Sequence, residues 1–130
     1  MIALVSTAYG IYAVDLETEE VTAGEGPVAP PPAPAVDLPL LVAAAASGST
    51  VVALLDRRPP LAISHDAGST WREAGGGLPA GRAVAIAPDD PDLVVYAARN
   101  RLHVSTDGGR FWRALAAELP EIDAVGLAAG

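Results

Sequence analysis

The chain has 130 residues, the length of a single domain that buries roughly two thirds of its unfolded surface. Hydrophobic residues make up 51% of it and aromatic residues only 5%, which excludes a disordered chain and predicts a core of small aliphatic side chains. Eight basic residues, all Arg, stand against 16 Asp and Glu, for a net charge of −8. Nucleic acid is therefore not expected as a partner, because neutralising phosphate requires a basic surface.

The composition also limits chemistry and location. Cys is absent, so the chain has neither disulfides nor thiolate metal ligands. The two His residues, His65 and His103, occupy different positions of the repeat and form no ligand pair, so we expect no metal and no cofactor. The first ten residues have no basic region ahead of their short apolar run, unlike a signal peptide. Prolines and Asp37 interrupt the long uncharged stretch, so we expect no membrane span. These features predict a cytoplasmic protein.

Short apolar runs separated by turn residues predict an all-β chain. In chain order, the N-terminal part has three expected strands, at residues 2–7, 10–15 and 19–25. A Pro-rich segment at residues 26–38 follows, and we expect it to be a polyproline-like connector. The next part has four strands, expected at residues 41–46, 50–55, 61–65 and 69–74. Four more are expected at residues 82–88, 93–98, 102–106 and 110–115.

The chain repeats itself with an offset of 41 residues. Residues 61–87 align without a gap on residues 102–128, pairing Arg72 with Arg113 and Leu78-Pro79 with Leu119-Pro120. A period near 40 residues is typical of a repeated supersecondary unit. The final segment, residues 123–130, aligns with the strand that opens the preceding unit. It therefore supplies the strand that the N-terminal part lacks, for a total of twelve.

The clearest repeated motif is S-x-D-x-G-x-x-W. It occurs as Ser64, Asp66, Gly68 and Trp71 in a first box (residues 64–71), and as Ser105, Asp107, Gly109 and Trp112 in a second box (residues 105–112). A carboxylate in a tight turn accepts hydrogen bonds from the turn's own amides, Gly supplies a positive φ, and Trp covers the hairpin. This predicts a structural cap of a hairpin instead of a catalytic or metal site.

The motif resembles the Asp-box of the BNR-repeat family, which includes β-propellers of sialidases, sortilin-type receptors and photosystem II assembly factors. The resemblance implies a β-propeller of four-stranded antiparallel blades. Blade one would comprise residues 1–25 completed by residues 123–130, blade two residues 39–79, and blade three residues 80–120. Three blades are too few to close a ring. We therefore expect a homodimer with six blades, in which residues 123–130 of one chain pair with residues 2–7 of the other.

In such a propeller, the loops opposite the Asp-boxes share one face. This places a set of polar residues together as a candidate ligand site: Arg57, Arg58, Arg82, Arg99, Asn100 and Arg101. Guanidinium groups bind carboxylate or phosphate through paired hydrogen bonds. The alternative is that these Arg side chains are solvated or paired with acids on the same rim, namely Asp56, Glu118, Glu121 and Asp123.

The expected function is that of a non-catalytic binding or scaffold propeller, recognising a protein or a small anionic ligand on the Arg-bearing face. The alternative is a glycan-active, sialidase-like hydrolase assembled at the oligomer axis. That resemblance implies an Arg triad and a Tyr nucleophile assisted by Glu, yet no motif pairs Tyr9, Tyr12 or Tyr96 with a Glu. No catalytic residue is therefore assigned. A third hypothesis is a structural propeller unit with no ligand.

Overall fold

The computed structural model describes residues 1–26, 28 and 34–128, and these form three four-stranded antiparallel sheets. The first sheet, in the order β12-β1-β2-β3, contains β1 (Ile2–Thr7), β2 (Gly10–Asp15), β3 (Val21–Ala23) and β12 (Ile122–Ala128). The second contains β4 (Leu41–Ser47), β5 (Thr50–Leu55), β6 (Leu61–Ser64) and β7 (Arg72–Ala74). The third contains β8 (Ala83–Ala87), β9 (Asp90–Ala97), β10 (Leu102–Ser105) and β11 (Arg113–Ala114).

The all-β class predicted from the sequence is confirmed, with strands in the expected order. The last strand of each sheet is shorter than expected: β7 begins at Arg72 instead of residue 69, and β11 at Arg113 instead of residue 110. The reason is that backbone amides of the preceding box residues donate to the Asp side chain of the box instead of to a neighbouring strand. No helix in the described residues has the length and apolar character needed to cross a membrane.

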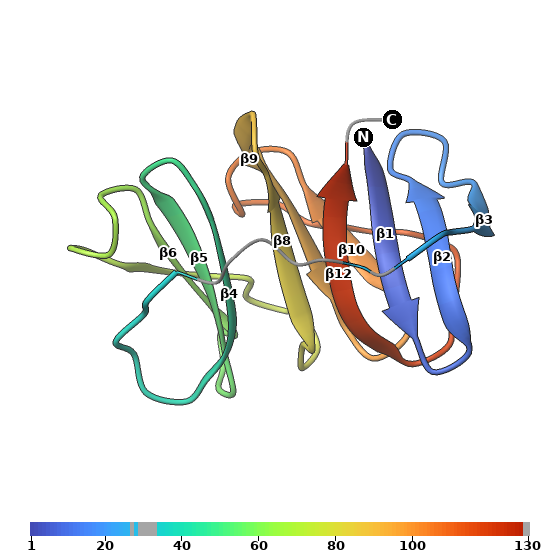
Figure 1. Ribbon diagram of the computed structural model, residues 1–130. Helices are drawn as coiled ribbons and strands as arrows, with labels where there is room; N and C mark the ends of the chain where they lie inside the picture. The colour runs from blue at the N-terminus through green and yellow to red at the C-terminus, as the bar shows by residue number, and fades with distance from the viewer. Residues whose placement is uncertain (27, 29–33, 129–130) are drawn as a thin grey trace.

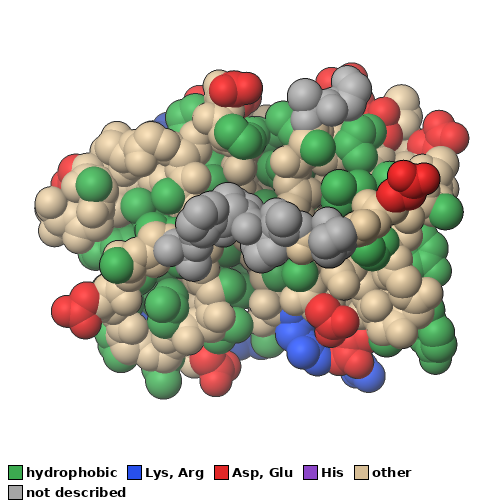
Figure 2. Space-filling model, viewed as in Figure 1, with side chains coloured by type: hydrophobic (Ala, Val, Ile, Leu, Met, Phe, Trp, Pro, Cys, Tyr) green, Lys and Arg blue, Asp and Glu red, His purple; other side chains and the backbone are tan. Residues whose placement is uncertain are grey.

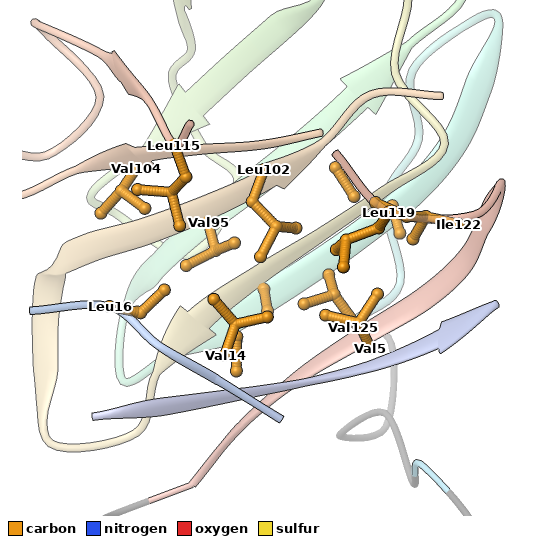
Figure 3. Close-up of a cluster of buried hydrophobic side chains, with 14 residues drawn as sticks. Val5, Val14, Leu16, Val95, Leu102, Val104, Leu115, Leu119, Ile122 and Val125 are labelled. Atoms are coloured by element: carbon orange, nitrogen blue, oxygen red, sulfur yellow. The ribbon is translucent and has the colours of Figure 1, made fainter. Parts of the chain in front are cut away.

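The third sheet lies between the other two. Its strand β8 packs against β4 on one side and β12 on the other (Figure 1). All five residues of β8 are buried, whereas β4 begins with exposed residues. One apolar core lies between the second and third sheets and another between the third and first. Figure 3 shows the latter, in which Val5 and Val14 of the first sheet face Val95 and Leu102 of the third.

Strand β12 completes the first sheet of its own chain. It pairs antiparallel with β1, with Val5 opposite Val125 and Ile2 opposite Ala128. The sequence prediction placed residues 123–130 beside a partner's β1. The same backbone hydrogen bonds form in either arrangement, so exchange between two chains stays a prediction. Residues 129 and 130 lie outside the described residues.

The connector from β3 to β4 joins the two outer sheets. It leaves the first sheet after β3 and enters the second sheet at β4, and the third sheet lies between these two sheets (Figure 1). It occupies residues 24–40, a longer stretch than residues 75–82 before β8 or residues 115–121 before β12. The polyproline prediction for residues 26–38 falls in part on residues 27 and 29–33, outside the described residues.

Candidate functional site

Three of the loops at the end of the sheets opposite the boxes contact one another. The Leu119 amide donates to the Asn100 carbonyl at 2.8 Å, which joins the connector before β12 to the β9–β10 loop. The Ala8 amide donates to the Glu121 carbonyl at 3.1 Å, which adds the β1–β2 turn. We call this the arginine end; it comprises residues 8–9, 56–60, 75–82, 98–101 and 115–121. In the view of Figure 2, basic side chains gather at the lower edge, toward which the β1–β2 turn points, with acidic side chains beside them.

Three of the five candidate Arg side chains form ion pairs. Arg57 lies 3.7 Å from Glu73, Arg101 lies 3.0 Å from Glu118, and Arg82 pairs with Glu121. These pairs are largely solvent-exposed, so each contributes about 0–1 kcal/mol. Among the described residues, Arg58 and Arg99 have no carboxylate within ion-pair distance. Arg58 and Arg99 are therefore the candidates whose charge is not already matched in this way.

The candidate residues do not form one cluster. A hollow of about 160 Å³ opens between the β5–β6 loop and the connector before β8. Arg57 and Arg58 line it, together with the acidic Asp56 and with apolar residues that include Val42, Leu55 and Pro79. Arg82, Arg99, Asn100 and Arg101 do not line this hollow; their segments contact the connector that leads to β12. The structure thus combines two guanidinium groups, the carboxylate of Asp56 and an apolar lining at one place.

One wall of the hollow is held by Tyr96, which sequence reasoning left without a role. The Tyr96 side chain is fully buried, and its hydroxyl donates to the Pro79 carbonyl at 2.5 Å. Burial raises the pKa of Tyr96 to about 12, against the opposing effect of the nearby Arg58 charge. Gly81 is required beside it, because a Cβ there would collide with the Tyr96 ring. The sequence feature that could have revealed this role is a Tyr within an aliphatic run. A buried Tyr hydroxyl needs a hydrogen-bond partner, so such a Tyr is expected to bond to a neighbouring segment.

The two boxes have the hydrogen bonds expected of structural caps. In the second box, the Ser105 hydroxyl donates to Asp107 at 2.7 Å and accepts from the Gly109 amide at 2.9 Å. The Asp107 carboxylate also accepts from the Arg110 and Phe111 amides, at 3.1 and 3.0 Å. Gly109 has a φ of 88°, a conformation that favours glycine. This carboxylate is therefore engaged by its own loop.

The first box repeats this geometry around Asp66. Hydrogen bonds from the Thr70 hydroxyl and amide, and from the Ser64 hydroxyl, lower the pKa of Asp66 to about 2. The same kind of bonding lowers the pKa of Asp107, chiefly through the Phe111 amide. Both side chains are therefore ionised acceptors at neutral pH and have no proton to donate.

Arg72 and Arg113 are a second feature that sequence reasoning missed. Arg72 donates to the Gly108 carbonyl of the third sheet at 2.7 Å, and Arg113 donates to the Leu16 carbonyl beside the first sheet at 3.2 Å. In each case the acceptor follows the Asp of a turn, Asp107 or Asp15. The sequence did contain an indication of this shared role, because Arg72 and Arg113 align in the 41-residue repeat.

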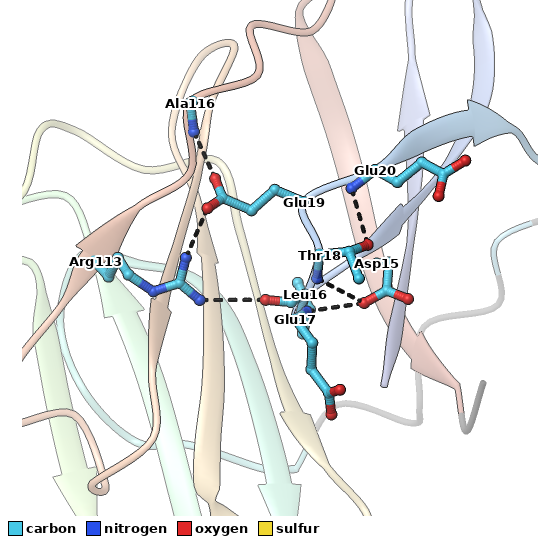
Figure 4. Close-up of polar contacts among 8 residues, drawn as sticks. All are labelled: Asp15, Leu16, Glu17, Thr18, Glu19, Glu20, Arg113 and Ala116. Carbon is cyan, nitrogen blue, oxygen red and sulfur yellow. Dashed lines mark hydrogen bonds and ion pairs between the residues drawn. The ribbon is translucent and has the colours of Figure 1, made fainter.

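Glu19 holds Arg113 in this position. The Glu19 carboxylate accepts from Arg113 at 3.1 Å and from the Ala116 amide at 2.9 Å (Figure 4). The Asp15 carboxylate accepts from the Glu17 and Thr18 amides, which lowers the pKa of Asp15 and shapes the turn that presents Leu16. This polar cluster joins the third sheet to the first and is not arranged as a ligand site.

No family model matches the chain, and neither does any curated protein. Within the part of the chain that the structure describes, no three Asp, Glu or His side chains lie together in a way that would hold a metal ion.

Proposed function

We propose that the chain is a non-catalytic propeller unit of the Asp-box kind, which binds an anionic group of a protein or small ligand at its arginine end. The observation that carries this proposal is the hollow lined by Arg57 and Arg58. Arg58 supplies a guanidinium group without a carboxylate partner among the described residues, in a chain whose net charge is −8. The hollow has two guanidinium groups and one carboxylate, that of Asp56, beside apolar residues. This excess of positive charge favours a ligand that carries a carboxylate or phosphate on a short apolar stem.

The size of the hollow narrows the ligand class. A volume of about 160 Å³ is below that of pockets that enclose drug-sized molecules, so it suits one side chain or a small anion. Arg57 already contacts Glu73 at 3.7 Å, and an incoming carboxylate would share or replace that pairing. An acidic side chain of a partner protein is therefore the ligand we propose.

We further propose that a second copy completes the three stacked sheets to a six-bladed ring. The support is that the sheets already pack through β4, β8 and β12, as blades pack around an axis. In this ring β12 pairs either with its own β1 or with that of the partner. The arginine ends of both copies would then lie on one face, which matches a scaffold that presents two equivalent sites.

The binding proposal is tested by NMR titration with acetyl-Gly-Glu-Gly-amide and with its Gln counterpart. We expect the Glu peptide to shift the Arg57 and Arg58 side-chain signals and the Gln peptide to leave them in place. Arg58→Ala should weaken the Glu peptide by roughly tenfold, the loss of one charge-assisted hydrogen bond. Arg110→Ala, in the second box at the other end, is the matched control and should bind normally.

Equal binding by Arg58→Ala and the native chain would overturn the proposed site. Turnover of a fluorogenic sialoside that is abolished by the same substitution would replace the binding function with the hydrolase alternative.

A further inference from the structure

The first and third sheets present equivalent residues at equivalent positions. In the third sheet, Val84 pairs with Tyr96, and both face the second sheet. In the first sheet, Val125 pairs with Val5, and both face the third sheet. Val84 and Val125 also align in the 41-residue repeat. The three sheets are therefore stacked in one direction, second to third to first, each turning the same side toward the sheet before it.

The outward side of the first sheet corresponds to the side of the third sheet that is buried against a neighbouring sheet. In the third sheet, the neighbouring pair Val95 and Val104 points the other way and is buried against the first sheet. The corresponding pair in the first sheet is Leu4 and Ala13, which points away from the stack and is only half-buried. Ile11 on β2 is also half-buried, where the third sheet has the buried Leu102. The corresponding apolar sides of the second and third sheets are each covered by a neighbouring sheet.

The outward side of the second sheet is the complementary half. Ala53, Leu55 and Ala62 are buried there, and among the described residues they are covered by Val36, Leu38 and Trp71 and not by another sheet. The Leu38-Pro39 pair corresponds to Leu78-Pro79 and Leu119-Pro120 before the other opening strands. Leu78 and Leu119 are buried within the cores between sheets, whereas Leu38 remains half-exposed. Leu38 therefore lies where a core between sheets would form if another sheet preceded the second sheet in the stack.

We infer that these two outward sides are the halves of a third sheet-to-sheet interface, and that a second copy of the chain closes it. The first sheet of each copy packs on the second sheet of the other, and a two-fold axis repeats the contact. The occupant is a second copy because each half matches the corresponding half of an interface already present within the chain. This inference deepens the proposed ring and is independent of the anion site.

The closing interface lacks a polar contact that both internal interfaces have. Arg72 pairs across its sheet with Ile63, and Arg113 pairs with Val104. The residue opposite Ala13 in the first sheet is Thr22, which is exposed and too short to reach a neighbouring sheet. The missing bond makes the closing contact weaker than the internal ones, so its formation should depend on concentration.

The acceptor for such a bond is available in the second sheet. Ala67 aligns with Gly108, whose carbonyl accepts from Arg72. Both residues follow the Asp of a box and have positive φ angles, 58° at Ala67 and 76° at Gly108. An Arg at position 22 of one copy should therefore find the Ala67 carbonyl of the other in the same geometry.

The experiment is analytical ultracentrifugation of the full chain from micromolar to millimolar concentration. We expect a monomer–dimer equilibrium, which Thr22→Arg tightens by roughly tenfold through the added hydrogen bond. Thr22→Met, which has a long side chain without a donor, should not reproduce that tightening. Ala13→Glu places a charge on the outward side of the first sheet and should weaken the dimer at least tenfold, while circular dichroism shows an unchanged fold.

A chain that stays monomeric at millimolar concentration as native protein and as Thr22→Arg would overturn the inference. So would a trimer, or a dimer that tolerates Ala13→Glu. A monomer that still binds the Glu peptide would refute this interface and leave the anion site standing. A dimer of the expected kind that ignores the peptide would refute the anion site alone.

Discussion

At the scale of single residues, buried polar groups in this protein hold loops in place, either within one loop or from a neighbouring strand. Ser64 and Ser105 are almost fully buried, and each joins an Asp carboxylate to a glycine amide. Tyr96 does the same for the connector beside the candidate site, through its bond to Pro79. Because burial disfavours the charged form of Tyr96, that hydroxyl links the stability of the hollow to pH.

The pH dependence of stability above pH 10 should be due in part to Tyr96. Its pKa is raised to about 12 in the folded chain, above the ordinary value of 10.0. The folded chain therefore holds the hydroxyl proton more tightly than the unfolded chain does. The stabilisation is complete below about pH 10 and disappears as the pH rises through about 12. The expected loss is about 1–3 kcal/mol, measured by urea unfolding followed with Trp fluorescence.

Tyr96→Phe is the matched control for this prediction. It should be less stable at pH 8 by about 1 kcal/mol, the contribution of one hydrogen bond, and should lack this loss between pH 10 and 12. Parallel pH profiles for the two proteins would contradict the assignment.

At the scale of elements, the connectors determine which sheets can be neighbours. Residues 75–82 and 115–121 each lead from one sheet to an adjacent one, and each buries a Leu between the two. Residues 24–40 instead lead from one end of the stack to the other. Their extra length is what allows β1 to pair with β12 of the same chain, because a connector as short as the other two would join neighbouring sheets only.

Deleting residues 29–33 should therefore convert pairing within one chain to exchange between two chains. Because an extended chain spans at most about 3.3–3.6 Å per residue, removing five residues shortens the greatest reach of the connector by roughly 17 Å. Without them the first sheet should no longer reach its own β12. We expect a dimer that exchanges subunits slowly, detected by energy transfer after mixing donor-labelled and acceptor-labelled protein. Replacing the same five residues with a Gly-Ser segment of equal length is the control. This variant should exchange subunits as fast as the native chain. A folded, monomeric deletion variant would contradict this role of the connector.

At the scale of the whole molecule, two kinds of contact should respond oppositely to salt. Each chain has a net charge of −8, so two copies repel one another, while the proposed contact between them is apolar. The Arg58 site depends on attraction between opposite charges near the surface. Screening acts on both effects, because the Debye length falls from about 30 Å at 0.01 M to about 3 Å at 1 M salt.

Raising the sodium chloride concentration over this range should strengthen dimerisation several-fold and weaken binding of the Glu peptide several-fold. Ultracentrifugation measures the first effect and NMR titration the second. Sodium sulfate at matched ionic strength should strengthen the dimer further, because it favours burial of apolar surface. A dimer that weakens as salt is added would indicate that ion pairs, and not apolar sides, hold the copies together.

Much of the fold and part of the candidate site could be predicted from particular residues. The alternation of apolar runs with turn residues located the strands, and the Ser, Asp, Gly and Trp of each box predicted its local hydrogen bonds, because these groups are neighbours in the chain. The sequence could not predict which Arg side chains form ion pairs and which do not. Whether Arg57 meets Glu73 while Arg58 has no such partner depends on how two loops are placed in space.

The all-β class, the number of strands and the hydrogen bonds within the boxes follow from the sequence, because they depend on local periodicity and on groups within single hairpins. The position of the third sheet in the middle, the bonds by which Arg72 and Arg113 join sheets, and the support that Tyr96 gives to the wall of the hollow became visible only in the structure. These features arise where residues distant in the chain pack together. A repeat of 41 residues specifies the unit and its contacts, but the order in which the units stack follows from the length of the connectors between them.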